Sequence, residues 1–257
     1  NSTAIPPLNG NYVINQTGGA GVDFTSIGAA LDALEAAGVS GPVTLTITDS
    51  ATYSANSSYT LGLNSTGVVS AVAGVSATNT ITLRAATGQS PKIQGNATGA
   101  VLQTITGRGC LGIMTSYVAV EGLEVFGGPN FGILIQGNNT TLRPENNTIR
   151  ACKVHDIPDG PGIAYMGQNS SYATNILIEN NFVWNCFTNS GNPITSTVLL
   201  NNTGGCITLR NAATGSGVVR HNTILHTSSF GGTTLNSAAT AGIYAFSSST
   251  TYALNNI

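Results

Sequence analysis

Apolar and polar residues alternate with period two in four segments that can be laid over one another. They are V-A-V-E-G-L-E-V (118–125), N-T-I-R-A-C-K-V (147–154), I-L-I-E-N-N-F-V (176–183) and G-V-V-R-H-N-T-I (217–224), and a fifth copy, Y-A-L-N-N-I, runs to residue 257. Two columns of the alignment are apolar in every copy. They hold Val120, Ile149, Ile178, Val219 and Tyr252, and then Val125, Val154, Val183, Ile224 and Ile257. The alternation predicts short β-strands, and its recurrence predicts an internal repeat.

Two polar columns lie between the apolar ones. One reads Glu121, Arg150, Glu179, Arg220, and the other reads Leu123, Cys152, Asn181, Asn222, Asn255. Neighbouring strands stack about 4.8 Å apart, so alternating charges attract where like charges would repel. Stacked amides at a bend between strands bond to their neighbours above and below. We therefore interpret both columns as structural ladders.

A second series of strands follows the first after loops of unequal length. Its strands open at Gly132-Ile133, Gly162-Ile163, Cys206-Ile207 and Gly242-Ile243. Short strands that recur with variable loops are typical of stacked coils. The sequence therefore predicts an all-β fold, a solenoid of the parallel β-helix type.

The N-terminal region differs from the rest, because T-S-I-G-A-A-L-D-A-L-E-A-A-G (25–38) predicts a helix. Thr25 or Ser26 caps it, Gly38 ends it, and its apolar stripe consists of Ile27, Ala30, Leu31 and Leu34. A helix placed before the first coil would cover the open end of the apolar column. We assign a leader and capping helix to 1–42 and the β-helix coils to 43–257, with residues 1–10 free to pair elsewhere. We expect the coil that ends at Ile257 to continue into further coils or to meet a neighbouring subunit.

Composition narrows the class of protein. Only 7% of the 257 residues are charged, against about 25% in ordinary globular domains, while 41% are hydrophobic. That hydrophobic content excludes a disordered chain. A net charge of −2 excludes a basic nucleic-acid footprint, and no run of about 18 apolar residues predicts membrane insertion.

Four motifs resemble one family. They are N-Y-V-I-N-x-T-G-G-x-x-x-D-F-T-S-I-x-A-A-L-D-A-L (11–34), G-V-S-G-P-V-T-L-T-I (38–47), A-T-N-T-I-T-L-R-A-A (77–86) and S-Y-V-A-V-E-G-L-E-V (116–125). The chain resembles large secreted bacterial surface proteins with right-handed parallel β-helix repeats of the pectate-lyase-like superfamily. The resemblance implies a right-handed coil and secretion. It does not fix an activity, since the superfamily holds lyases, hydrolases, adhesins and phage tailspikes.

The segment K-V-H-D-I-P-D-G-P-G (153–162) holds the best catalytic candidates. Polysaccharide-cleaving β-helices need clustered carboxylates with calcium and a basic residue, or a pair of carboxylates. This segment gathers Lys153, His155, Asp156 and Asp159. However, D-G-P-G is turn chemistry, and Asp156 aligns with Asn185 and His226 in a further polar column. We therefore expect no catalytic residue, with these four as the candidates if there is one. Calcium would be required only by a lyase, and no other metal or cofactor is expected.

Three residue types mark the surface and the redox compartment. Aromatic residues make up only 6% of the chain and concentrate in its middle, where a sugar-stacking surface would use Tyr165, Tyr172, Trp184 and Phe187, beside Phe182.

The four cysteines are either small buried residues or members of up to two disulfides, for which three pairings are possible: Cys110, Cys152, Cys186 and Cys206. Sequons for N-glycosylation begin at Asn15, Asn56, Asn64, Asn96, Asn138, Asn146, Asn169 and Asn201.

The leading functional hypothesis is a non-catalytic structural or adhesive segment of a secreted, cell-surface protein or extracellular fibre. Its partners would be further copies or coils at the C-terminal end and a cell-surface or matrix polysaccharide, with no nucleic acid. Two alternatives remain open. One is a polysaccharide lyase or glycoside hydrolase with a groove along the coils, and the other is a carbohydrate-binding module.

Overall fold

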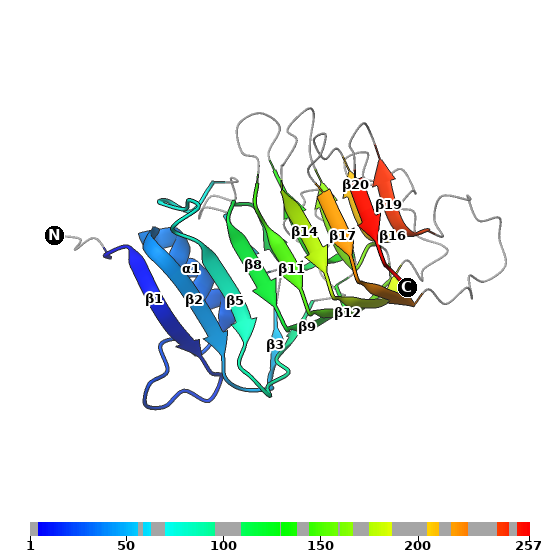
Figure 1. Ribbon diagram of the computed structural model, residues 1–257. Helices are drawn as coiled ribbons and strands as arrows, with labels where there is room; N and C mark the ends of the chain where they lie inside the picture. Colours follow the sequence, from blue (N-terminus) through cyan, green and yellow to red (C-terminus); the bar gives the residue numbers. More distant parts are fainter. Residues whose placement is uncertain are drawn as a thin grey trace.

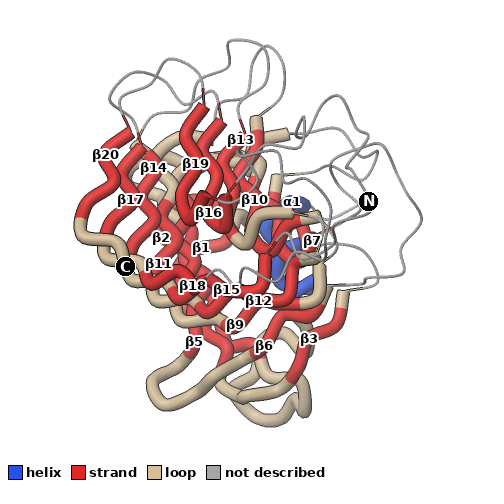
Figure 2. Tube along the Cα trace, turned by 90° about the vertical axis from the view of Figure 1, so that its right-hand side faces the viewer, coloured by secondary structure: helices blue, strands red, loops and turns tan. Residues whose placement is uncertain are grey.

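The described residues of the protein form three parallel β-sheets and one helix (Figures 1 and 2). The computed structural model describes residues 5–55, 59–62, 70–95, 109–128, 130–137, 144–158, 160–166, 175–186, 205–210, 217–225, 241–246 and 251–257.

Sheet A has eight strands, and sheets B and C have six each. Sheet A contains β1 (Leu8–Ile14), β2 (Val39–Ile47), β5 (Ile81–Ala85), β8 (Val118–Glu121), β11 (Thr148–Arg150), β14 (Ile176–Glu179), β17 (Gly217–Arg220) and β20 (Thr251–Leu254). Sheet B contains β3 (Thr52–Ser54), β6 (Lys92–Gln94), β9 (Glu124–Phe126), β12 (Lys153–Ile157), β15 (Phe182–Cys186) and β18 (Thr223–Leu225). Sheet C contains β4 (Tyr59–Leu61), β7 (Gly109–Ile113), β10 (Phe131–Gln136), β13 (Ile163–Met166), β16 (Gly205–Arg210) and β19 (Ala241–Phe246).

From β2 onward the chain visits sheets A, B and C in a fixed cycle. Figure 2, which looks along the stack, shows the three sheets as three sides around a common interior. The prediction of an all-β chain with parallel sheets and one helix is confirmed, and the arrangement is consistent with a parallel β-helix.

The two apolar columns face the interior in the expected register through the first four copies. Ile257 does not continue the second column, because it occupies the position equivalent to Thr223 and is 88% exposed. Val120, Ile149, Ile178 and Val219 pair across sheet A, and each is at most 1% exposed. The strands that open at residues 132, 162, 206 and 242 likewise align through Ile133, Ile163, Ile207 and Ile243.

The fifth copy is displaced by one residue from the predicted alignment. Val219 pairs with Ala253, and Tyr252 lies opposite Val218. Because strand side chains alternate between faces, a one-residue slip moves every residue to the other face. The prediction that Tyr252 aligns with Val219 is therefore wrong.

Helix α1 (Ile27–Ala37) forms as its sequence predicts. The Ser26 hydroxyl accepts a hydrogen bond from the Ala29 N–H at 3.1 Å, and Gly38 ends the helix at φ 70°. Ile27, Ala30, Leu31 and Leu34 are buried. In Figure 2 the helix lies within the outline of the three sheets, at the end from which the stack begins.

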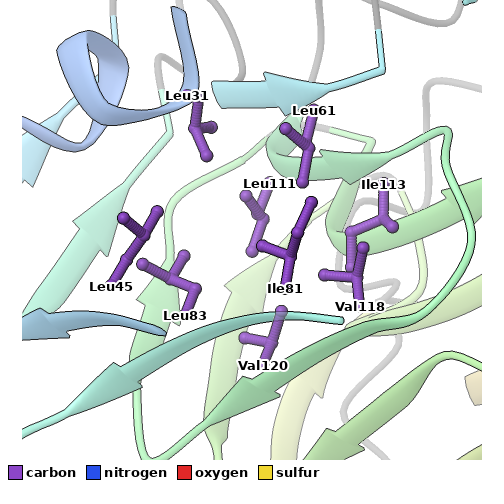
Figure 3. Close-up of a pocket in the computed structure, with 9 residues that line it drawn as sticks. All are labelled: Leu31, Leu45, Leu61, Ile81, Leu83, Leu111, Ile113, Val118 and Val120. Atoms are coloured by element: carbon purple, nitrogen blue, oxygen red, sulfur yellow. The ribbon is translucent and has the colours of Figure 1, made fainter. Parts of the chain in front are cut away.

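The interior beside α1 is entirely apolar. Figure 3 shows Leu31 of the helix with strand residues of sheets A and C around a small void: Leu45, Leu61, Ile81, Leu83, Leu111, Ile113, Val118 and Val120. A void with no polar lining is packing space and offers no group to bind or transform a ligand.

The N-terminal leader is not wholly free. Residues 8–14 form β1, which pairs in parallel with β2 at the edge of sheet A. The expectation that residues 8–10 stay free to pair elsewhere is therefore wrong, because this edge strand is already used within the chain.

Turns between sheets use left-handed backbone conformations. One column of such residues joins sheet A to sheet B: Gly122, Ala151, Asn180, His221 and Asn255, with φ between 49° and 71°. A second column lies at the C-terminal ends of the sheet B strands: Gly127 directly after β9, and Asp156 and Asn185 as the next-to-last residues of β12 and β15, with φ of 75°, 54° and 51°. Glycine, asparagine and aspartate tolerate this conformation better than other residues. The left-handed conformation places Asp156 near the C-terminal end of β12.

Candidate functional site

The charged column lies on the outward side of sheet A. Register places Glu121, Arg150, Glu179 and Arg220 side by side, and Arg84 extends the series before Glu121. Arg150 Nη2 lies 2.7 Å from Glu121 Oε1, and Arg220 Nη2 lies 2.6 Å from Glu179 Oε2. These carboxylates are held by cations in the stack, so they are not available as a catalytic pair. Arg84 was not among the residues assigned to this column from the sequence, although T-I-T-L-R (80–84) has the same alternation before a terminal charge.

The amide column lies inside the turn between sheets A and B. Asn181 and Asn222 are buried, and Asn181 Nδ2 donates to Asn222 Oδ1 at 2.9 Å. The next amide in line is Asn256, whose Oδ1 accepts from the Asn222 N–H at 3.0 Å. Asn255, which we expected in this column, is exposed and instead follows His221 in the left-handed column. Its assignment to the amide column is wrong for the same one-residue displacement that affects Tyr252.

The outward side of sheet B holds the most varied chemistry among the described residues. We call it the sheet B face and define it by two rows that register aligns. The first row is Gln94, Phe126, His155, Trp184 and Leu225. The second row is Lys92, Glu124, Lys153, Phe182 and Thr223.

Three rings of the first row stack along the coil axis. The ring centroids of Phe126 and His155 are 5.4 Å apart and those of His155 and Trp184 are 4.1 Å apart, with interplanar angles of 6° and 11°. Stacking at these angles covers the flat sides of His155, so the row presents ring edges outward. Phe182 packs at 30° against Trp184 with its centroid 4.4 Å away.

Exposed apolar surface adjoins the stacked rings. Phe182 is 38% exposed and Leu225 is 51% exposed, and both lie beside Trp184. Buried aliphatic residues are usual in this chain, whereas large hydrophobic residues at the surface are few among those described. Exposed apolar groups next to polar ones are typical of a binding surface.

Charged groups frame the rings. His155 Nδ1 lies 2.8 Å from Asp156 Oδ2, and its Nε2 lies 3.5 Å from Glu124 Oε1. Lys92 Nζ lies 3.4 Å from the same Glu124 oxygen. Each ring nitrogen of His155 therefore faces a carboxylate, and these two contacts fix the orientation of the imidazole.

Asp156 is held ionised by its neighbours. Partial burial tends to raise its pKa, but hydrogen bonds from Asn185 and His155 and the charge of His155 outweigh that effect and lower the pKa below its usual value. The Asn185 bond is 2.9 Å long, from Nδ2 to Asp156 Oδ1. A carboxylate with a lowered pKa accepts hydrogen bonds and is a poor general acid.

The sequence-derived catalytic candidates come partly together. Lys153 and His155 both point outward from β12, and Asp156 is the next-to-last residue of the same strand, with φ 54°. Asp159 lies outside the described residues, as does His226, so the expected column of Asp156 and Asn185 is seen only in part.

The expected sugar-stacking residues divide into three groups. Trp184 lies on the sheet B face, and Tyr172 and Phe187 lie outside the described residues. Tyr165 is fully buried, because its β13 position faces the interior beside Ile135. The prediction of Tyr165 as a surface-binding residue is therefore wrong. Sequence analysis did not find Phe126 and Leu225, although the column through Trp184 would have shown them.

The four cysteines are buried thiols: Cys110, Cys152, Cys186 and Cys206. Burial raises the pKa of both Cys110 and Cys152 to about 12, so these thiols stay protonated and unreactive. Of the two interpretations of the cysteines, the structure agrees with small buried residues in the stack.

Two of the predicted sequons lie in the described part of the chain. Asn15 Nδ2 donates to Thr48 Oγ1 at 3.1 Å, and Asn146 Oδ1 accepts from Asn175 Nδ2 at 2.9 Å. The other sequon residues, Asn56, Asn64, Asn96, Asn138, Asn169 and Asn201, lie outside the described residues. Glycosylation stays a prediction.

The described ranges show neither a metal-binding cluster nor a membrane-spanning helix. No group of three or more His, Cys, Asp or Glu side chains there is placed to hold a metal ion. No helix of the described chain is both long and apolar enough to cross a bilayer.

Comparison with known proteins returned one structural likeness. No family model and no curated protein matches the sequence. Among solved structures, the chain is similar to an alginate lyase from Paenibacillus sp. str. FPU-7, with a TM-score of 0.49 and 12% sequence identity over 88% of this chain and 73% of the other. At this level the likeness does not assign an activity.

The leading functional hypothesis from sequence is corrected by this comparison. We expected a non-catalytic structural or adhesive segment, whereas the similar solved structure is that of an enzyme, an alginate lyase. The non-catalytic adhesive interpretation is therefore wrong as the first choice. The residues of the chain itself must decide between the remaining alternatives.

Proposed function

We propose that this protein binds a polysaccharide along the sheet B face. The observation that carries the proposal is the alignment, over successive coils, of an exposed apolar platform with charged and amide groups. Phe182 and Leu225 supply the platform, and Lys153, Asp156 and Asn185 border it. Sugars present apolar C–H surfaces together with hydroxyl groups, so a surface of this mixed character suits them.

The repeat of the coils favours a polymer over a compact ligand. Neighbouring strands place equivalent side chains about 4.8 Å apart along the coil axis. A chain of sugar units that runs along this axis therefore meets one outward side chain from each of the two rows at every coil. Since the flat sides of the stacked Phe126, His155 and Trp184 rings cover one another, the sugar would contact Phe182, Leu225 and the ring edges.

Cleavage of the bound polymer is the second candidate, favoured by the position of Lys153. This exposed amine lies on the same face as Phe182, and only Val154 separates it in the chain from the His155–Asp156 pair. A lyase removes the proton next to a uronate carboxylate and breaks the glycosidic C–O bond by β-elimination, which leaves an unsaturated end on one product, while the departing sugar oxygen takes up a proton from solvent. Lys153 would accept that proton or neutralise the carboxylate, while His155 is oriented by Glu124 and Asp156. The described residues do not fit a calcium site, so no calcium-dependent step is included.

Several finer features belong to the same proposal. We infer a right-handed coil with α1 as its N-terminal cap, supported by the buried apolar stripe of the helix. Export from the cell fits the low charged content and the sequons, and the relation to large secreted bacterial surface proteins is supported by the sequence motifs alone.

Affinity electrophoresis in gels that contain acidic or neutral polysaccharides tests the binding proposal. We expect at least one polysaccharide to retard the protein, and Phe182→Ala to weaken the retardation roughly tenfold, the equivalent of about 1.4 kcal/mol. Leu177→Ala is the matched control, because Leu177 is an outward apolar residue on sheet A. Equal retardation of both variants would place binding elsewhere.

The cleavage candidate has its own readout. Incubation with uronate polymers should produce unsaturated ends, which are detected by their ultraviolet absorbance. Lys153→Ala should abolish this product, whereas Leu177→Ala should form it as fast as the wild type does. Retardation without any release, across acidic polymers, would leave binding and remove the lyase candidate.

A further inference from the structure

We propose that Cys186 and Cys206 are a disulfide-forming pair that links two successive strands of the coil. Cys186 is the last residue of β15, and Cys206 is the second residue of β16, so a bond between them closes the intervening segment into a covalent ring. The proposal is independent of the polysaccharide-binding function.

The two thiols already lie against each other. Each residue is 1% exposed, and the Cys186 and Cys206 thiols share a hydrogen bond. Cys186 Sγ also packs against Gly162 of the preceding coil, since a Cβ added to Gly162 would lie 3.0 Å from this sulfur. Gly162 precedes Ile163, which pairs with Ile207, so Gly162 and Cys206 occupy the same column of sheet C.

That column contains glycine or cysteine. Register places Cys110 of β7 beside Gly132, then Gly162, then Cys206 and Gly242, and a Cβ at Gly132 or Gly162 would collide with Val154 or Val183 respectively. Cys206 follows Gly162 in the stack and carries a thiol on the side where Cys186 Sγ approaches Gly162. The local geometry therefore brings Cys186 and Cys206 together, whereas Cys110 lies three strands from Cys206 in the same column.

The remaining thiols have other partners. The Cys110 thiol donates to the Phe126 carbonyl at 3.2 Å, and the Cys152 thiol donates to the Arg150 carbonyl at 3.3 Å. Both thiols donate to backbone carbonyls and not to a second sulfur. Of the pairings that four cysteines allow, the structure favours Cys186–Cys206 alone, with Cys110 and Cys152 left reduced.

The oxidation balances with a small-molecule disulfide as the oxidant. The Cys186 thiolate attacks one sulfur of glutathione disulfide and releases one glutathione thiol, and Cys206 then displaces the second glutathione to form the protein disulfide. Two protein thiols are oxidised and one glutathione disulfide is reduced to two thiols. The hydrogen bond to Cys206 and burial raise the pKa of Cys186 well above its usual value, so exchange in the folded protein is slow. Formation during folding is the faster route.

The test is to refold reduced full-length protein with a mixture of reduced and oxidised glutathione, then to alkylate free thiols under denaturing conditions and map the peptides. We expect two free thiols, at Cys110 and Cys152, and one Cys186–Cys206 cross-link. The Cys206→Ser variant should retain three free thiols. Four free thiols in the wild type, or a cross-link that involves Cys110 or Cys152, would overturn the proposal.

A second measurement does not depend on any variant. Thermal unfolding of the oxidised wild type should occur on the order of 5–10 °C above that of the same protein after reduction, because the cross-link restricts the unfolded chain. Identical midpoints for a protein that contains the mapped cross-link would show that the pair does not constrain the coil.

Discussion

Replacing Asn181 with alanine should destabilise the fold more than any exposed substitution nearby. Asn181 is 2% exposed, and its side chain makes three hydrogen bonds. Its Oδ1 accepts from the Cys152 N–H at 3.0 Å, and its Nδ2 donates to the Ile149 carbonyl at 3.0 Å and to Asn222 Oδ1 at 2.9 Å. Alanine would leave the buried Cys152 N–H and the second lone pair of the Ile149 carbonyl without these partners.

The expected magnitude follows from the groups that lose partners. Each buried polar group left unsatisfied costs about 1–3 kcal/mol, so Asn181→Ala should lower the free energy of unfolding by about 2–5 kcal/mol. For a chain of this size each kcal/mol shifts the unfolding midpoint by about 2–4 °C, which gives a fall on the order of 5–15 °C.

The control is the adjacent Asn180→Ala. Asn180 is exposed and left-handed at φ 55°, and alanine already occupies the equivalent turn position of the preceding coil as Ala151, at φ 54°. Unfolding of both variants is followed by circular dichroism during heating and in urea. If Asn181→Ala and Asn180→Ala unfold at the same midpoint, the amide ladder does not stabilise the coil and the reasoning fails.

Two further predictions address the corrected column and the acidic residue of the sheet B face. Asn256→Ala should destabilise the protein more than Asn255→Ala, because Asn256 hydrogen-bonds to Asn222 and to the Val219 carbonyl whereas Asn255 is exposed. The thermal unfolding midpoints of the two variants measure this difference. A lower midpoint for Asn255→Ala would support the alignment predicted from the sequence instead. Asp156→Asn, which keeps a side chain suited to the left-handed turn, should cost less than about 1 kcal/mol because Asp156 is largely exposed. Since folding lowers the pKa of Asp156, its contribution is complete above the ordinary aspartate pKa of about 3.9 and is lost as pH falls through the lower folded pKa. Urea unfolding of both proteins from neutral to acidic pH checks this, and a difference that grows toward acid would contradict the sign.

The sequence predicts the coil well where two constraints agree. Val120, Ile149 and Ile178 are inner residues by alternation, and the charged column independently fixes the same register. The last copy lacks a charged residue to fix its position, so Y-A-L-N-N-I could be placed one residue out without breaking the pattern. Asn256 and Asn255 are chemically identical, and only the backbone pairing distinguishes them.

The candidate site is less accessible to sequence reasoning, because it depends on which residues share a face across coils. Lys153, His155 and Asp156 are neighbours in the chain and were found together. Phe126 and Leu225 come from other coils, and they join Trp184 only once the sheet B register is known. Tyr165 shows the opposite error, since aromatic type alone does not distinguish an inner position from an outer one.

The intrinsic fluorescence of Trp184 tests the central claim most directly. It is the single tryptophan of the chain and lies in the ring row of the sheet B face, so its emission reports on that face alone. Titration with the polysaccharide that retards the protein in affinity gels should change the intensity or wavelength of emission in a saturable manner. The change should weaken in Phe182→Ala and persist in Leu177→Ala. A polysaccharide that binds the protein while the emission of Trp184 stays constant would contradict the account.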